Sequence, residues 1–190
     1  ADESNIGLSA IPDFGAKYLA AVSRGTQVLQ DPYLFTHWQD LIGGGGVYGS
    51  SLPEEEIQFR IFSAIAAGTI FNFDASTSKG YMTGSLFSAV DARRPWLQKA
   101  VSMPWAALVV SEPTRQFYGR GDPVNLYMNN CFGYYAALLE QHIPVDLITH
   151  TDLRAGMASN YKVLILPNTA CMSNADITAV RNFVTAGGGL

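Results

Sequence analysis

The sequence predicts an α/β fold in which parallel strands are covered by helices. From residue 105 onward, short apolar runs alternate with segments of helical periodicity, which is typical of an open sheet wound by helices. Residues 12–74 show a similar order of helix, strand, long loop, helix and strand. The run at 106–110 is apolar at every position, as expected for a strand covered on both faces.

Two apolar stripes define the helices of the amino-terminal part. Phe14 and Tyr18 lie four residues apart, and Ile57, Ile61 and Ile65 repeat every four residues, which is the spacing of a helix that packs on a sheet. The expected elements are a helix at 12–22, a strand at 26–30, a long loop at 31–51 with four consecutive glycines, a helix between Ser51 and Gly68, and a strand at 69–74.

Residues 75–104 contain the candidate boundary between two regions. The stretch 75–85 is loop-like, and residues 86–102 are expected to form one helix broken at Pro95 or two short helices, because proline lacks the amide donor that a helix interior needs.

The carboxyl-terminal part is expected to contain strands at 106–110, 145–148 and 163–166, and helices from Asp122 to about His142 and from Ser173 to Gly187. Ser173 and Asp176 have the spacing of a capping box. Ile177, Val180 and Val184 are expected to form the buried face of the last helix. The sequence stops one residue into the next expected strand, so we expect the chain to act as part of something larger.

Composition excludes several classes of partner. The formal net charge is −4, only 15% of the residues are charged, and there is no run of Lys or Arg, so nucleic acid is not an expected partner. No apolar stretch approaches the roughly 20 residues that span a bilayer, so no membrane partner is expected either. Cys131 and Cys171 have neither CxxC spacing nor a nearby His, which indicates free thiols and neither a metal site nor a redox pair.

Several segments resemble one known family. LPEEEIQFRIFSAIAAGTIFNFD at 52–74 resembles the last helix and strand of the (β/α)8 barrel in family 42 β-galactosidases and related glycoside hydrolases. The segments ALVVSEPTRQFYG, YYAALLEQHIPVDLITHTDL and YKVLILPNTACMSNADITAVRNFVTAGGGL resemble the beginning of the trimerisation domain that follows this barrel. That domain has a flavodoxin-like fold related to class I glutamine amidotransferases.

The resemblance implies a partial (β/α)8 barrel followed by a partial flavodoxin-like open sheet. Residues 1–80 would be a barrel-like βα segment, 81–104 a linker helix region, and 105–190 the incomplete flavodoxin-like domain, which favours a homo-oligomer. The implied reaction of the parent protein is hydrolysis of a glycosidic bond in a galactoside-like substrate without a cofactor.

The implied catalytic pair is incomplete in this chain. Retaining glycosidases use two carboxylates about 5 Å apart, which the family carries on barrel strands four and seven. The strand that matches the seventh ends at Gln30 and Asp31, where a glutamate would be expected. Asp31 and Asp74 lie at the carboxyl ends of consecutive predicted strands, on the face where barrel active sites are built, so they are the acidic candidates. The alternative interpretations are a turn that starts at Asp31 and a loop cap at Asp74.

His37, Trp38 and Tyr48 are the candidate carbohydrate contacts. An aromatic ring beside a polar group suits a sugar, because the apolar face of the pyranose stacks on the ring while its hydroxyls form hydrogen bonds. The alternative is that Trp38 and Tyr48 attach the glycine-rich loop to the protein.

Glu112, Arg115 and Tyr118 are the candidate interface residues, because they follow the strand at 106–110 and partners meet such sheets at the carboxyl ends of strands. Solvated loop residues are the alternative. Cys171 also follows a strand, but it lacks the glycine-rich elbow of an amidotransferase nucleophile.

The leading hypothesis is therefore a piece of a glycoside-hydrolase-like protein that is not catalytic by itself. The alternative is a self-contained α/β binding or oligomerisation module without enzymatic activity.

Overall fold

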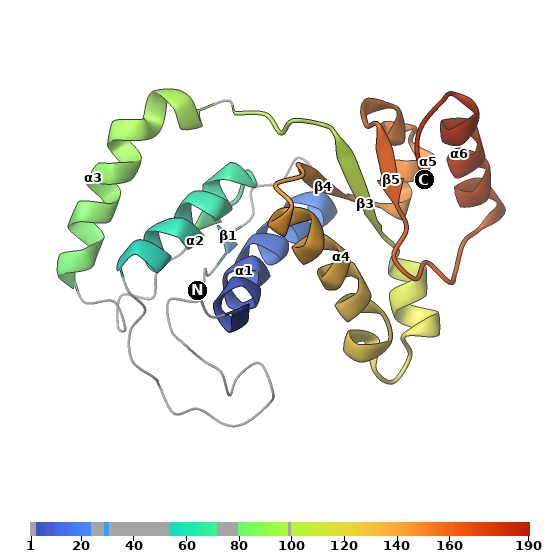
Figure 1. Cartoon of the computed structure of the whole chain (residues 1–190), viewed down its shortest axis with the longest axis horizontal. Coiled ribbons are helices and arrows are strands. Elements are labelled where there is room, and N and C mark those ends of the chain that lie inside the picture. The colour runs from blue at the N-terminus through green and yellow to red at the C-terminus, as the bar shows by residue number, and fades with distance from the viewer. Residues whose placement is uncertain (1–2, 24–28, 31–53, 72–79, 99) are drawn as a thin grey trace. The chain divides into compact units, whose positions relative to one another are not determined.

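The computed structural model describes residues 3–23, 29–30, 54–71, 80–98 and 100–190. The chain divides into two compact units, Ala1–Val101 and Ser102–Leu190 (Figure 1). Each unit has its own parallel strands and helices, which confirms the predicted fold class.

Unit 1 alternates helices with two short strands. Its elements are α1 (Glu3–Val22), β1 (Leu29–Gln30), α2 (Glu54–Ala66), β2 (Ile70–Phe71) and α3 (Gly80–Leu97). The two strands pair in parallel, with Leu29 opposite Ile70. Helix α2 contacts α1, β2 and α3. The predicted order of elements is thus confirmed where the structure describes it.

The predicted stripe of α2 lies partly in the core of unit 1. Ile61 and Ala64 are buried and Ile65 is partly buried, whereas the side chain of Ile57 lies outside the described part. Gly68 ends the helix with a φ of +80°. Its N–H donates to the carbonyl of Ile65 and the next N–H donates to that of Ala64, which is the Schellman arrangement that favours glycine.

Helix α3 corrects the prediction for residues 75–104. The structure has one continuous helix from Gly80 to Leu97, so the loop expected up to residue 85 is helical from 80 and Pro95 does not divide the helix. Pro95 lies in the last turn, where only the carbonyl of Asp91 loses its helical partner. Extending an existing helix over Gly84 adds one backbone hydrogen bond per residue, and the Ser88 hydroxyl also donates to the Gly84 carbonyl.

Unit 2 is built on a three-stranded parallel sheet with the order β4-β3-β5. The strands are β3 (Ala106–Val110), β4 (Val145–Thr149) and β5 (Val163–Ile165). All five residues of β3 are buried, which confirms the prediction of a strand covered on both faces. An isolated parallel bridge joins Val163 to Gly189 on the far side of β5. The three strands, numbered by their order within unit 2, lie side by side as second, first and third, and the bridge at Gly189 comes next. The flavodoxin-like strand order begins in the same way.

The helical segments of unit 2 are η2 (Thr114–Tyr118), η3 (Val124–Met128), α4 (Asn129–Glu140), α5 (His150–Arg154), η4 (Met157–Asn160) and α6 (Asn174–Thr185). The segment expected as one helix from Asp122 to His142 consists of η3, whose turns are wider than those of an α-helix, followed by α4. Helix α5 and the turn η4 were not predicted, because four or five residues are too few to show a periodicity.

The core of unit 2 lies between the sheet and the layer of α5 and α6, while α4 covers the other face (Figure 1). The residues of this core cluster are Ala107, Val109, Ile148, Leu153, Ala158, Leu164 and Phe183. The predicted capping box of Ser173 and Asp176 is present. The predicted buried face of α6 is wrong at its end, because Val184 is exposed and Phe183 is buried. Phe183 lies three residues after Val180 and so falls on the same side of the helix.

Candidate functional site at the carboxyl ends of the strands

The strand order of unit 2 reverses at β3. The chain leaves β3 for β4 on one side and later returns to β5 on the other side. Open α/β sheets bind ligands outside the carboxyl ends of the strands at this point. The segments that meet here are the one that follows β3, starting at Ser111, and the one that follows β5, which contains Cys171.

A closed ring of hydrogen bonds joins these two segments. The Cys171 N–H donates to Thr114 Oγ1 at 3.1 Å, and Thr114 Oγ1 donates to Ser111 Oγ at 2.9 Å. Ser111 Oγ in turn lies 3.4 Å from the Cys171 carbonyl oxygen, to which it donates. Ser111 and Thr114 are buried. Their hydroxyl groups therefore bind the chain's own backbone at the place where a ligand would lie in other sheets of this type.

Two further contacts hold the same region. The Ser111 N–H donates to the hydroxyl of Tyr127 at 2.6 Å, and the side chain of Tyr127 is fully buried. Asn168 has a φ of +40°, and its Nδ2 donates to the Leu126 carbonyl at 3.0 Å. The segments after β3 and β5 are thus both attached to η3.

Glu112 and Arg115, two of the predicted interface residues, form an ion pair. Arg115 Nε lies 2.8 Å from Glu112 Oε2, and the terminal Nη2 lies 2.5 Å from Oε1. Gln116 Nε2 also donates to Oε1, at 2.7 Å. The hydrogen bond from Arg115 is the main reason why the pKa of Glu112 is below its usual value. Tyr118, the third predicted residue, is exposed on the same turn.

Tyr118 is one of several exposed apolar side chains on η2 and η3, and the other ones were not predicted from the sequence. Phe117, Val124 and Leu126 are also exposed, and η2 and η3, which carry these side chains, contact each other. The signal in the sequence was the pair of apolar positions on either side of the turn GRGDP at 119–123.

The remaining predicted site residues lie outside the described part of the chain. These are Asp31 and Asp74, proposed as acidic groups, and His37, Trp38 and Tyr48, proposed as sugar contacts. They stay predictions.

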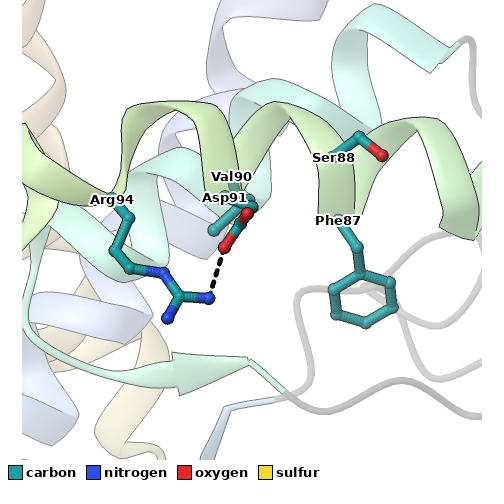
Figure 2. A pocket seen from close by; sticks show the side chains of 5 residues that line it. All are labelled: Phe87, Ser88, Val90, Asp91 and Arg94. Carbon is teal, nitrogen blue, oxygen red and sulfur yellow. Dashed lines mark hydrogen bonds and ion pairs between the residues drawn. The ribbon is translucent and has the colours of Figure 1, made fainter.

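Unit 1 carries one further surface feature, an open pocket along α3. Its lining consists of Phe87, Ser88, Val90, Asp91 and Arg94 (Figure 2). Arg94 pairs with Asp91 one turn away, and the ring of Phe87 is half exposed. The pocket therefore offers an apolar ring beside charges that already neutralise each other.

Cys131 is buried and Cys171 is partly buried, and neither forms a disulfide. Burial raises the pKa of the Cys131 thiol. In the part of the chain that the structure describes, no group of three or more His, Cys, Asp or Glu side chains could hold a metal ion. None of the described helices combines the length and the apolar character needed to cross a membrane.

Residues 100–190 match the sequence model of a family described as the β-galactosidase trimerisation domain. Among curated proteins, none matches the sequence.

Solved β-galactosidases resemble the chain over nearly its whole length. The enzyme of Rahnella sp. R3 is 21% identical, with a TM-score of 0.73, over 97% of this chain and 30% of its own. That of Bacillus circulans sp. alkalophilus is 20% identical, with a TM-score of 0.69, over 94% of this chain and 29% of its own. The GH42 β-galactosidase Gan42B is 18% identical, with a TM-score of 0.69, over 99% of this chain and 30% of its own.

At these identities the likeness to the solved structures concerns the fold. The chain spans about 30% of the length of these structures. The predicted resemblance to family 42 β-galactosidases is confirmed, and the match to the trimerisation-domain family lies in the second half of the chain.

Proposed function

We propose that the chain provides the assembly region of a glycoside-hydrolase-like protein related to family 42 β-galactosidases. The observation that carries this proposal is the match of residues 100–190 to the trimerisation domain. The flavodoxin-like strand order of unit 2 supports it. We propose that the protein forms a homo-oligomer and that residues 1–80, 81–104 and 105–190 are its barrel-like segment, linker helix region and assembly domain.

We further propose that hydrolysis of a galactoside-like bond belongs to the whole protein and that this chain does not catalyse it alone. Double displacement at a sugar needs a nucleophile and an acid/base. Strand β1 ends at Gln30, which cannot serve as either, and Asp31 follows it. The chain spans about 30% of the length of the β-galactosidases it resembles, so much of the barrel and its carboxylates would come from sequence that this chain does not contain.

The 190-residue chain tests both parts of this proposal. Sedimentation velocity is expected to show a homo-oligomer, and an assay with aryl galactosides is expected to show no turnover. Turnover that disappears in Asp31→Asn but persists in Asp91→Asn, an exposed carboxylate on α3, would contradict the claim that the chain is inactive. A strictly monomeric chain would contradict the assembly role.

The sugar contacts have their own test. If His37, Trp38 and Tyr48 bind carbohydrate, galactose is expected to change the tryptophan fluorescence of the chain, and Trp38→Phe should remove that change while Trp96→Phe should not. A response to galactose that persists in Trp38→Phe would contradict this assignment.

A further inference from the structure

Segments η2 and η3 each bury one side chain and expose apolar side chains. In η2 the buried residue is Thr114, while Phe117 is 73% exposed. In η3 the buried residue is Tyr127, while Val124 and Leu126 are exposed. Thr114 and Tyr127 are thus buried, while the neighbouring Phe117, Tyr118, Val124 and Leu126 are exposed. We call the exposed group of Phe117, Tyr118, Val124 and Leu126 the outer-turn surface.

The hydrogen bonds of the buried hydroxyl groups hold the outer-turn surface in place. Thr114 is attached to Ser111 and to the backbone of Cys171, and Tyr127 accepts the N–H of Ser111. This network attaches η2 and η3 to the sheet through buried groups, and breaking it would leave those polar groups without partners. The apolar side chains are therefore kept outward by the fold, in a surface that is preorganised for contact.

The charges beside the outer-turn surface are balanced. Arg115 is paired with Glu112, and Asp122 is bonded to Asn125. With Arg120 between them, the segment 112–122 carries two positive and two negative side chains. The whole chain has a net charge of −4, so two copies repel each other in general. A contact through this neutral segment adds no repulsion between like charges within the contact itself.

We propose that the outer-turn surface is the face of unit 2 on which a second copy of this chain docks. This inference rests on the proposed assembly role and adds the surface that performs it. Exposed apolar groups that are rimmed by polar side chains are typical of protein interfaces, and aromatic residues such as Phe117 and Tyr118 are enriched at their centres. The match to a trimerisation domain indicates a copy of the same chain as the occupant.

Sedimentation velocity of the full 190-residue chain and two of its variants tests the proposal. Phe117→Ser removes the most exposed ring of the surface, and Val184→Ser is the matched control, because Val184 is an exposed apolar residue on α6 in the same unit. We expect Phe117→Ser to raise the dissociation constant of the oligomer about tenfold or more, which is the size of effect that marks a central interface residue. We expect Val184→Ser to leave the dissociation constant unchanged.

The outcomes separate this inference from the assembly role. If the unmodified chain is monomeric, the assembly role itself fails. If the unmodified chain assembles and Phe117→Ser assembles equally well, the assembly role stands and the outer-turn surface is the wrong face. If Phe117→Ser lowers the unfolding temperature but leaves the oligomer intact, the surface is covered from within the same chain, and the inference is again overturned.

Hydrogen exchange on the unmodified chain gives a measurement that needs no variant. Across a series of protein concentrations that spans the dissociation constant, we expect the amides of residues 114–128 to gain protection as the oligomer forms. Protection gained only by amides elsewhere in the chain would overturn the proposal.

Discussion

Arg154 holds Asp176 through both carboxylate oxygens. Nε of Arg154 lies 2.5 Å from Oδ1, and Nη2 lies 3.1 Å from Oδ2. Asp176 also accepts the backbone N–H of Ser173 at 2.7 Å, and its side chain is only 3% exposed. The carboxylate of Asp176 thus caps the amino-terminal end of α6 and links it to the last turn of α5.

Asp176→Asn is expected to destabilise unit 2 by about 2 kcal/mol. The substitution keeps the shape of the side chain but removes the charge that faces Arg154. Breaking a fully buried pair costs about 3–5 kcal/mol, and the partial exposure of Arg154 reduces that figure. Urea unfolding followed by far-UV circular dichroism measures the loss. Asp91→Asn, in the exposed pair with Arg94, is the control and should change stability by less than about 0.5 kcal/mol. Equal effects of the two substitutions would contradict the stabilising role of the Arg154–Asp176 ion pair.

The same carboxylate makes the stability of unit 2 depend on acid pH. Burial alone would raise the pKa of Asp176, but the hydrogen bonds from Arg154 and Ser173 outweigh it and lower the pKa to about 2. The unfolded chain binds this proton near pH 3.9. The stabilisation is therefore complete above about pH 5 and is lost as the pH falls through 4 towards 2, with a total of about 2 kcal/mol.

The pH-dependent stabilisation by Asp176 is measured as the difference in unfolding free energy between the unmodified chain and the Asp176→Asn variant. The difference should be constant above about pH 5 and should shrink between pH 4 and pH 2. Other carboxylates titrate in both proteins and cancel in the difference. A difference that stays constant down to pH 2 would show that Asp176 has an ordinary pKa.

Thr114→Val is expected to loosen the segment that follows β5. Valine has nearly the same shape, but it leaves the Cys171 N–H without its acceptor and Ser111 Oγ without the hydroxyl that donates to it. An unsatisfied buried polar group costs about 1–3 kcal/mol. Faster hydrogen exchange of the Cys171 amide, at unchanged exchange in α6, is the expected result. Thr178→Val is the control, because the Thr178 hydroxyl is exposed and bonds only within its own helix. Unchanged exchange at Cys171 would contradict the hydrogen-bonded ring.

Gly188→Ala and Gly133→Ala are expected to act in opposite directions. A Cβ at Gly188 would lie 2.3 Å from two ring carbons of Phe183, a core residue, so the ring must shift at a cost of about 1–3 kcal/mol. At Gly133, inside α4, a Cβ would meet no atom within 4 Å, and alanine should stabilise the helix by about 0.5–1 kcal/mol. Urea midpoints of the two variants test this pair. A Gly188→Ala variant as stable as the unmodified chain would show that Phe183 is not tightly packed.

Much of the fold could be predicted because its signals are local. The continuous apolar run at 106–110 and the breaks at Gly68 and Pro144 depend on residues close together in the chain. The capping box of Ser173 and Asp176 spans four residues and appears as expected. The errors also have local causes. Pro95 does not break α3, because it lies in the last turn and removes only one backbone hydrogen bond there.

The candidate site could be predicted only in part. The sequence indicated Glu112, Arg115 and Tyr118 through their position after a strand, and the structure pairs the first two. The link between Thr114 and Cys171 could not be read from the sequence, because 57 residues separate them. The exposure of Phe117 could not be read either, since an apolar residue in a sequence is expected to be buried.

The sequence by itself determined that the chain is an α/β protein, where most of its strands lie, and that it resembles the trimerisation region of a β-galactosidase. The first two properties follow from hydrophobic periodicity and from turn and capping residues, which act over a few positions, and the third is a resemblance of sequence segments. Only the tertiary structure decided that the hydroxyl groups of Ser111 and Thr114 bind the backbone of Cys171, that Arg154 pairs with Asp176, and which apolar side chains of η2 and η3 are exposed. Each of these depends on which strands are neighbours in the sheet, and contacts between distant residues form only when the fold brings them together.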